Sequence, residues 1–463
     1  MDLAGSVLED LRASIGGLVI GPEDEGYDEA RKVWNADIDR RPAVIARCAS
    51  AADVARAIGF AHEHNLEIAV RGGAHSIPGA SVVDDGMQID LSMMNQVTVD
   101  AQAKRARCGG GALLSDLDAA TQAHGLAVPA GLVSHTGVGG LTVGGGMGWL
   151  TRRGGLTIDN LVSAEVVTAD GEIRRASDDE NTDLFWAIRG GGGNFGVVTE
   201  FEFRLHEVGP IVQLGLLFWG LDQGPEILRL ADQVIPTLPR EVNVIIAGLN
   251  APPAPFVPAE HHFVPGYALL VVNTGAPELH EAAMNRLREA LPPVFQFADS
   301  LPYVALQQLL DEANAWGLYS YDKSTYLAEL TDGAIAVIAE HLPRKASPLS
   351  VLLFYRLDGA FSEVGEDNTA FGGGRSPRYA VFIIGVCPNP ELLAADRAWV
   401  RGLWEALAPH SIGNASYVNA MSEDETGDRV RVTYGAKYDR LAGIKRQYDP
   451  DNIFHRNTNI KPA

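Results

Sequence analysis

A glycine-rich tract in the first third of the chain constrains the fold more than any other feature. Residues 131–155 read GLVSHTGVGGLTVGGGMGWLTRRGG and hold ten of the chain's 50 glycines. Glycine weakens both helices and strands, so we expect neither element within the tract. The interleaved Leu141, Val143, Met147 and Trp149 are too apolar for a flexible linker. The tract is therefore predicted to be buried backbone that lies close against a ligand, because residues without side chains permit that approach.

A second glycine-containing segment follows a predicted strand at residues 66–70. Residues 71–76 read RGGAHS, so two glycines stand directly after the strand. Successive N–H groups in such a position can form a nest that binds an anion, for example a diphosphate. Taken alone, His75 is most simply a loop histidine with a local hydrogen bond. The segment indicates anion binding only in combination with the tract at 131–155.

A third run, GGGNFG at residues 191–196, matches the dinucleotide-binding pattern G-x-G-x-x-G. That pattern must follow a strand and open a helix. Here a predicted helix at 183–189 precedes the run, and a predicted strand at 197–203 follows it. The order of elements therefore excludes a Rossmann dinucleotide-binding site at this run.

The rest of the first 205 residues alternates short strands with helices. The N-terminal 20 residues are predicted to form an amphipathic helix, and Ser50 is expected to cap a second helix that continues to residue 65. A further helix is expected around residues 113–125. Residues 161–177 read as a hairpin that turns at Ala169-Asp170-Gly171. Other predicted strands cover residues 43–48, 87–91 and 196–205.

The composition changes near residue 206. From there to about residue 414, long apolar strands alternate with amphipathic helices, which predicts an antiparallel sheet covered by helices on one face. The predicted strands are 211–219, 267–274, 350–357 and 379–386, and the predicted helices are 279–291, 331–342 and 394–407. The proline-rich residues 251–265 are expected to form a loop. The tail is predicted to be a helix that stops at Asp449-Pro450.

Charge and cysteine content limit the partners. The chain has 37 Lys and Arg against 59 Asp and Glu, a formal net charge of −22, which disfavours nucleic acid and anionic membrane surfaces. Cys48, Cys108 and Cys387 are far apart, so neither a disulfide framework nor a metal site is predicted. The N-terminus lacks the basic start of a signal peptide, and no apolar run is long enough for a membrane span. We expect a cytoplasmic protein; the oligomeric state is left open.

Several motifs occur in order along nearly the whole chain: RGGAHS, SHTGVGGLTVGGGMGWL, LTIDNL, VVTADG, LFWAIRGGGGNFGVVT, YVN and YDPDNIFHRNTNI. Together they resemble the berberine bridge enzyme-like oxidases of the vanillyl-alcohol oxidase superfamily, and most closely the bacterial oxidases of polyketide tailoring and 6-hydroxynicotine oxidase. The resemblance implies an α+β fold. In it, a PCMH-type FAD-binding domain of two subdomains (1–205, completed by 415–463) accompanies a substrate domain (206–414) built on an antiparallel sheet covered by helices.

The resemblance also implies how the flavin is held. His75 is expected to bond covalently to the 8α-methyl of FAD. Many members add a second bond through a cysteine four residues before the GVGG run, but this chain has Val133 there, so a single bond is expected. Thr136 matches the family's oxygen-gating position. The full set of expected FAD contacts is Arg71, Gly72, Gly73, Ala74, His75, Ser76, Gly79, Ser134, His135, Thr136, Gly137, Gly139, Gly140, Gly144, Gly145, Gly148, Asn194, Gly196, Val197, Asn419, Asn457 and Asn459.

The family's catalytic tyrosine is absent from its expected position in this chain. Several family members use the last tyrosine of a Y-x-N-Y motif, but here the run is Tyr417-Val418-Asn419-Ala420. Tyr417 and Tyr355 are the alternative candidates, although aromatic residues in strands more often serve packing. A polar and aromatic group, SYDKSTYL at residues 320–327, is expected in a loop and includes Lys323.

These observations predict an FAD-dependent oxidase that removes a hydride from an alcohol, an amine or an activated C–H group of a small organic molecule and reduces O2 to H2O2. One alternative is a dehydrogenase of the same fold that uses a quinone or another acceptor. A second alternative is a flavin-binding protein without turnover, because the usual base is absent.

Overall fold

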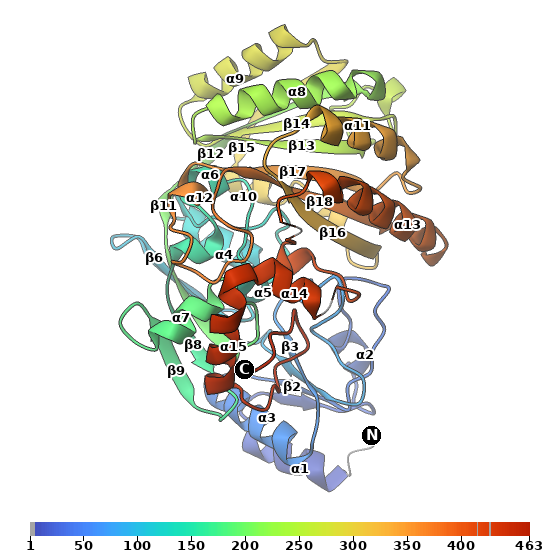
Figure 1. The fold of residues 1–463 in the computed structure, drawn as a ribbon. Helices are drawn as coiled ribbons and strands as arrows, with labels where there is room; N and C mark the ends of the chain where they lie inside the picture. Colours follow the sequence, from blue (N-terminus) through green and yellow to red (C-terminus); the bar gives the residue numbers. More distant parts are fainter. Residues whose placement is uncertain (1–4, 414, 426) are drawn as a thin grey trace.

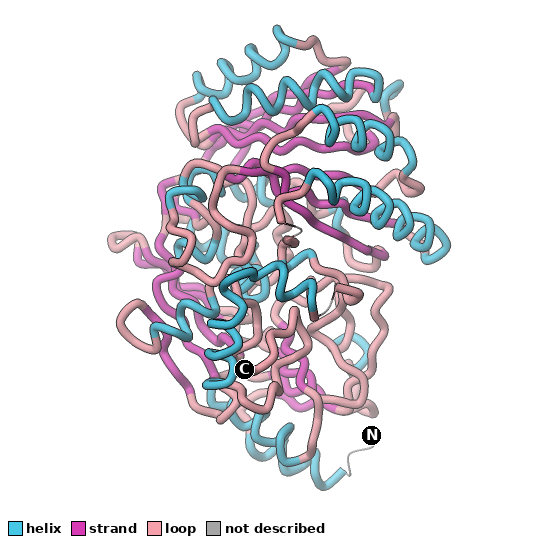
Figure 2. Tube along the Cα trace, viewed as in Figure 1, coloured by secondary structure: helices cyan, strands magenta, loops and turns pink. Residues whose placement is uncertain are grey.

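The computed structural model describes residues 5–413, 415–425 and 427–463. In Figure 1, one large sheet with its helices occupies the upper half of the molecule, and two smaller sheets occupy the lower half. Figure 2 shows that loops and short strands make up much of the lower half, whereas the upper half is regularly layered. Among the described residues, none of the helices combines the length and the apolar character that crossing a membrane requires.

The first small sheet has the strand order β1-β2-β4-β3. Strands β2, β4 and β3 are parallel, and β1 is antiparallel to β2. As predicted, Ser50 caps helix α3, because its side chain accepts a hydrogen bond from the N–H of Asp53. The predicted N-terminal helix ends earlier than expected, at Ser14, and residues 18–20 form a strand instead. The elements are α1 (Gly5–Ser14), β1 (Leu18–Ile20), α2 (Tyr27–Ala30), β2 (Val44–Arg47), α3 (Ala51–Glu63), β3 (Ile68–Arg71) and β4 (Met87–Asp90).

The second small sheet is antiparallel, with the strand order β5-β6-β10-β8-β9. Its hairpin β8–β9 turns through Gly171, as predicted. Helix α7 precedes the GGGNFG run and strand β10 follows it, which confirms that the run lacks the Rossmann context. The elements are β5 (Val97–Asp100), β6 (Arg105–Gly109), α4 (Leu114–Gln122), β8 (Leu161–Val167), β9 (Ile173–Ser177), α7 (Thr182–Ile188) and β10 (Val197–Arg204). Two further short strands, β7 (Leu126–Ala127) and β11 (His206–Glu207), form a separate two-stranded antiparallel sheet.

The large sheet has seven antiparallel strands in the order β15-β12-β14-β13-β17-β18-β16. Figure 1 shows helices α8, α9, α11 and α13 together on one face, which confirms the predicted arrangement. Their shared core contains Trp219, Ile227, Leu269, Ile338 and Leu403. The strands are β12 (Ile211–Gly220), β13 (Val242–Asn250), β14 (Pro265–Asn273), β15 (Phe295–Pro302), β16 (Tyr319–Leu327), β17 (Val351–Leu357) and β18 (Arg378–Cys387). The helices are α8 (Gly224–Val234), α9 (Pro277–Ala290), α10 (Tyr303–Gln307), α11 (Asp332–His341), α12 (Ala360–Glu363) and α13 (Pro390–Leu407).

Two predictions about local structure are wrong. Residues 320–327 form most of edge strand β16 and not a loop. Their polar side chains are buried because other segments supply hydrogen-bond partners, which a local pattern does not reveal.

The glycine tract is not free of helix either. It contains α5 (Val138–Gly144) and α6 (Thr151–Gly154). Tertiary packing overrides the low helix propensity of glycine here: a Cβ on Gly139 would lie 2.9 Å from the Gly110 carbonyl oxygen, and one on Gly144 only 2.0 Å from the Asn419 side-chain oxygen. The glycines let neighbouring segments press directly against the helix.

The chain end returns to the lower half. Helices α14 (Asp428–Tyr434) and α15 (Tyr438–Tyr448) follow the large sheet, and α15 packs beside α7 in Figure 1. As predicted, α15 ends just before Asp449-Pro450. The fully buried ammonium of Lys445 donates to the Asp449 carboxylate, to the Asn194 carbonyl 2.7 Å away and to the Phe454 carbonyl 3.0 Å away. These contacts fasten the tail to the GGGNFG run.

Candidate active site

Three glycine-containing segments meet at the end of strand β3. A Cβ on Gly73 would lie 2.2 Å from the backbone nitrogen of Gly137, so the backbones of residues 71–76 and of the tract are in direct contact. Residues 109–112 complete the junction, because the N–H of Val138 donates to the Ala112 carbonyl at 2.9 Å. Two segments that the sequence singled out separately are thus brought together, and only glycine fits where they touch.

His75 lies at this junction, in a loop with backbone strain. The preceding Ala74 has a φ of +55°, a left-handed conformation that is unfavourable for a residue with a side chain. The Nε2 atom of His75 is 2.6 Å from Nδ1 of His135. The His75 ring also stacks on Trp34, with 5.1 Å between the ring centroids. Trp316 meets the same ring edge-on at 6.4 Å.

The environment of His75 keeps its ring neutral. Burial, with a smaller contribution from His135, lowers the pKa of His75 to about 3. A neutral imidazole carries one N–H and one nitrogen with a free lone pair. At neutral pH the His75 ring is therefore uncharged and has a nucleophilic nitrogen, and its neighbours fix its orientation.

The turn at residues 133–136 is fixed from the large-sheet half of the chain. The Asp311 carboxylate accepts hydrogen bonds from the Ser134 backbone nitrogen at 2.8 Å and from the Ser134 hydroxyl at 2.5 Å. The N–H of Thr136 donates to the Val133 carbonyl at 3.1 Å, and the Thr136 side chain is half-buried. This turn presents His135 to His75.

A cavity of about 290 Å³ opens beside this pair. Trp316, which is 44% exposed, forms one wall, and the Arg71 guanidinium lies 6.0 Å from its ring centroid. The lining residues are Arg71, Gly72, Gly73, Ser92, Asn95, Gly111, Leu113, Asp116, His135 and Trp316. Neither Trp34 nor Trp316 belongs to a motif, so sequence reasoning missed both.

A second polar centre surrounds Tyr417. Its buried hydroxyl accepts a hydrogen bond from the Gly146 N–H at 2.8 Å and another from the Asn419 side-chain amide at 3.0 Å. Burial raises the pKa of Tyr417 to about 12, although both hydrogen bonds act in the opposite direction. The rings of Phe371 and Phe382 pack against it, with centroids 6.4 Å and 5.8 Å away. Two N–H donors on one buried phenol oxygen are suited to stabilising its anionic form.

Tyr355 joins the same cluster from strand β17. It pairs in register with Ile245 and Ala380, and Ala380 pairs with Tyr326, so these four side chains form a row on one face of the sheet. Tyr355 is half-buried and lies 5.1 Å from Phe382, edge to face. Burial, followed by the proximity of Tyr417, raises the pKa of Tyr355 above its usual value. The structure therefore brings together the two tyrosines that the sequence proposed.

Asn194 and the two tail residues Asn457 and Asn459 differ in how their amide groups are hydrogen-bonded. Asn194 is saturated by protein partners: it donates to the Gly191 and Thr458 carbonyls and accepts from the Ile460 N–H. By contrast, the buried amide oxygens of Asn457 and Asn459 have no hydrogen-bond partner among the described residues. Unpaired buried acceptors are rare, so these two oxygens are candidates for contact with a ligand.

The predicted glycine contacts also divide into two groups. A Cβ on Gly140 would meet nothing within 4 Å, so this residue faces open space. Gly148 and Gly196 press on backbone, with would-be Cβ positions 2.0 Å from the Ala130 carbonyl oxygen and 2.6 Å from that of Val167. Gly145 has a φ of +137°, and a Cβ there would lie 3.2 Å from the rings of Phe371 and Tyr417.

Three other predicted FAD contacts have partners within the protein. Gly79 packs against Ile38, the Ser76 hydroxyl accepts a hydrogen bond from the N–H of Ala80, and Val197 is paired in strand β10.

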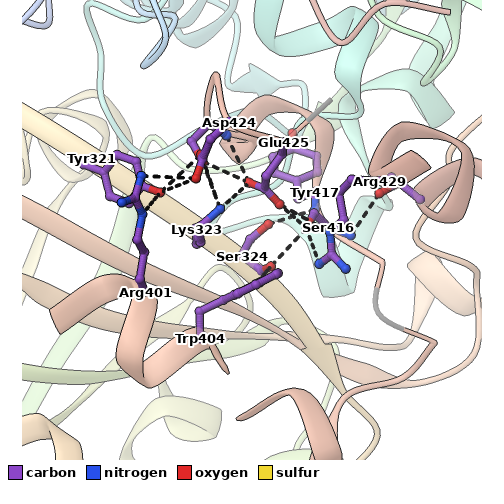
Figure 3. A network of polar contacts seen from close by, with 12 residues as sticks. Tyr321, Lys323, Ser324, Arg401, Trp404, Ser416, Tyr417, Asp424, Glu425 and Arg429 are labelled. Carbon is purple, nitrogen blue, oxygen red and sulfur yellow. Dashed lines mark hydrogen bonds and ion pairs between the residues drawn. The ribbon is translucent and has the colours of Figure 1, made fainter. Parts of the chain in front are cut away.

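A polar network adjoins Tyr417 (Figure 3); Lys323 and Glu425 are buried in it, and Asp424 lies at its exposed end. It connects Lys323 and Ser324 of strand β16 with Ser416, Asp424 and Glu425. Sequence reasoning placed Lys323 in a loop and did not relate it to Tyr417.

Two family profiles match the chain. One is described as an FAD binding domain and matches residues 42–177. The other is described as berberine and berberine like and matches residues 416–461. The second match contains Tyr417, Asn457 and Asn459, and the first contains His75 and His135.

Individual proteins agree with these profiles. The chain is 32% identical to (R)-6-hydroxynicotine oxidase of Paenarthrobacter nicotinovorans, over 97% of each chain. It is 31% identical to an FAD-linked oxidoreductase of Dictyostelium discoideum, over 99% of this chain and 98% of that protein. The crystal structure of 6-hydroxy-D-nicotine oxidase from Arthrobacter nicotinovorans superimposes with a TM-score of 0.85 at 29% identity, covering both chains in full.

Proposed function

The chain belongs to the berberine-like family of FAD-linked oxidoreductases, and on that premise we propose that it is an oxidase whose FAD is joined covalently to His75. We propose that it removes a hydride from a small organic molecule and passes the electrons to O2, with formation of H2O2. The observation that carries the proposal is the neutral, stacked His75 ring, held 2.6 Å from His135 at the junction of the glycine segments.

The residues present fit FAD. A diphosphate needs several N–H donors, and a flat ring system needs backbone that it can approach closely. Gly72 and Gly73 border the cavity, and Gly140 faces open space. The partnerless amide oxygens of Asn457 and Asn459 can accept hydrogen bonds from the cofactor, which would remove a cost of about 1–3 kcal/mol for each unpaired buried group. When bound, FAD supplies the hydride acceptor and the chemistry by which electrons reach O2.

Attachment through His75 alone follows from the chemistry of the side chains. The His75 ring offers a neutral nitrogen nucleophile in a fixed orientation. Val133, at the position of the second attachment in other members, carries only hydrocarbon and cannot form such a bond. We therefore propose one covalent bond and not two.

Tyr417 is proposed to hold the proton that the substrate loses. With a pKa of about 12 it is protonated at neutral pH, and its oxygen is oriented by Gly146 and Asn419. As the substrate gives up a hydride, one of its O–H or N–H groups must release a proton. The minor phenolate form of Tyr417, stabilised by the two N–H donors, accepts this proton and becomes the neutral phenol. In this role Tyr417 takes the place of the family tyrosine that is missing at Ala420, with Tyr355 beside it.

Thr136 is proposed to control the approach of O2. Its side chain is half-buried in the turn that also presents His135. A side chain of this size leaves more room than leucine would. The division into 1–205, 206–414 and 415–463 and a cytoplasmic location remain part of the proposal.

The experiment is a screen of the purified protein against alcohols, amines and hydroxylated heteroaromatic compounds under air, with flavin bleaching and H2O2 followed together. The proposal predicts bleaching and continuous peroxide release with at least one compound. Bleaching without O2 turnover would instead identify a dehydrogenase. Tight flavin binding with no bleaching by any compound would favour a protein without turnover.

A further inference from the structure

The segment that carries Tyr417 has little regular structure of its own. Apart from a single 3₁₀ turn at Val418–Ala420, residues 415–425 follow an irregular path along strand β16, the edge of the large sheet. No helix or strand ladder therefore sets the height of Tyr417 above the sheet. Its position must come from side-chain contacts, and Figure 3 shows these contacts concentrated on two neighbouring residues of β16, Lys323 and Ser324.

Ser324 and Ser416 make the direct connection. The backbone N–H of Tyr417 donates to the Ser324 hydroxyl oxygen at 2.8 Å, and the Ser416 hydroxyl donates to the Ser324 carbonyl at 3.2 Å. Ser324 pairs in register with Phe382, whose ring packs against Tyr417. Ser324 thus lies on the face of the sheet that carries the tyrosine cluster.

Lys323 lies on the opposite face. It pairs in register with Ile383, a member of the core beneath helices α11 and α13, and its ammonium is 4.7 Å from the ring centroid of Trp404 in α13. Only 3% of Lys323 is exposed. Because alternate residues of a strand point to opposite faces, this ammonium can act on Tyr417 only through intermediate groups.

The intermediate group is Glu425. Its carboxylate oxygen Oε2 is 3.3 Å from the Lys323 ammonium. Oε1 is 3.2 Å from the Ser416 hydroxyl, whose single proton is shared between Oε1 and the Ser324 carbonyl. The Ser422 N–H also donates to Oε2 at 3.0 Å, and the Arg429 guanidinium contacts Oε1 at 3.3 Å. One buried carboxylate therefore joins the cation of β16 to the residue immediately before Tyr417.

We propose that Lys323 and Glu425 are positioning residues that hold the Tyr417 hydroxyl at the Gly146 N–H through their buried ion pair. Removing both charges from water is costly, so such a pair adds little stability over a well-packed apolar pair. What it does supply is a defined distance and orientation between β16 and the 415–425 segment. The consequence for catalysis rests on the proposed role of Tyr417, but the position of the ring can be tested without turnover.

The test is nitration of the flavin-loaded protein with tetranitromethane, which modifies accessible tyrosine rings, followed by peptide mass spectrometry. In wild type, Tyr417 is expected to be protected. Lys323→Met removes the charge and should raise the nitration rate of Tyr417 by about tenfold, since local opening of the segment becomes easier. Lys323→Arg keeps the charge and should restore protection.

Two controls separate positioning from general loss of stability. Tyr321→Phe removes a hydroxyl on the same face. Among the described residues its hydrogen-bond partners are Asp424 and Arg401, at the exposed end of the network, so this variant should leave Tyr417 protected. Tyr267, buried in the large-sheet core, and Tyr303, buried in a separate cluster, report on the whole molecule. Unchanged nitration of Tyr417 in Lys323→Met, or a rise shared equally by Tyr267 and Tyr303, would overturn the proposal.

If Lys323→Met does not fold, the double variant Lys323→Met/Glu425→Gln removes both charges of the ion pair, and the partly exposed Arg429 keeps its hydrogen bond to the Ser416 hydroxyl. The double variant should fold and still expose Tyr417, and protection of Tyr417 in this variant would refute the proposal. A failure of the proposed role of Tyr417 in catalysis would appear elsewhere: the flavin of Tyr417→Phe would be reduced at the wild-type rate, while nitration of the Lys323 variants stayed as expected.

Discussion

The glycine tract touches both polar centres, but they are held in different ways. At its start, the turn at 133–136 presents His135 to His75, and the junction is made of backbone against backbone at Gly73 and Gly137. Further along, Gly146 donates to Tyr417, which is held by side chains of a distant strand and of the C-terminal segment. The first centre is fixed by close-packed backbone. The second depends on a buried polar network, and substitutions should therefore affect the two centres separately.

The largest effect is expected at the first centre. His75→Ala removes the only proposed attachment point, so covalently bound flavin should fall to zero. Some FAD should remain bound without a covalent bond, because the glycine backbone and the amides of Asn457 and Asn459 are unchanged. Acid precipitation followed by flavin fluorescence of pellet and supernatant measures both fractions. Covalent flavin in the pellet of this variant would show that another residue forms the bond.

Tyr417→Phe should act on the second centre alone. Loss of a positioned acid–base group typically slows the chemical step by about 10²–10⁴-fold, so anaerobic flavin reduction should slow by that order while covalent flavin stays at the wild-type level.

The pH dependence of the same step gives a second reading. Since burial raises the pKa of Tyr417 to about 12, the hydroxyl keeps its proton at neutral pH, and the fraction that can accept a proton grows as pH rises. The rate of anaerobic flavin reduction in the wild-type protein should therefore rise between pH 7 and 10. Stopped-flow traces at several pH values should show that Tyr417→Phe lacks this increase. The same increase in the variant would remove Tyr417 from the proton transfer.

Thr136→Leu tests whether the His75 end of the tract also controls oxygen. The bulkier side chain should slow reoxidation of the reduced flavin by about tenfold, which corresponds to about 1.4 kcal/mol, while anaerobic reduction by substrate is nearly unchanged. Separate stopped-flow measurement of the two half-reactions decides the matter. Equal losses in both would mean that Thr136 merely supports the loop and that the flavin has moved.

The smallest effects are expected from two glycine substitutions that form a matched pair. Gly145→Ala places a side chain at a φ of +137° against Phe371 and Tyr417, and such strain costs about 1–3 kcal/mol, so the melting temperature should fall. Gly140→Ala has free space in the protein, and we expect weaker FAD loading with little change in melting temperature. Thermal unfolding of each variant with and without added FAD compares them. A reversed pattern would assign the ligand-facing role to Gly145.

The two centres also differ in how far they could be predicted. RGGAHS and SHTG are contiguous motifs, so His75, His135 and the glycines around them could be named from the sequence. The packing of Trp34 and Trp316 against His75 could not, because each lies far away in the chain and in no motif. Helix α5 was missed because glycine propensity is weak evidence once neighbouring backbone packs against the tract.

Around Tyr417, local sequence patterns are less informative. Tyr417 and Tyr355 were identified as candidates, but strand β16 was mistaken for a loop. Its residues are polar on both faces, so the alternation that normally indicates a strand is absent. The partners that make those polar residues stable in a strand, such as Glu425 and Ser416, lie about 90 to 100 residues away and are visible only in the fold. Hydrogen-bond partners that lie so far apart in the chain cannot be recognised from a short stretch of sequence.

The central claim is that the flavin is attached through His75 and nowhere else. The most direct measurement is peptide mapping of the wild-type protein after acid precipitation and proteolysis, with the flavin located by absorbance and mass spectrometry. The account predicts a single flavin-bearing peptide, with the modification on His75. Release of all flavin into the acid supernatant, or a flavin-bearing peptide from residues 131–155, would contradict it.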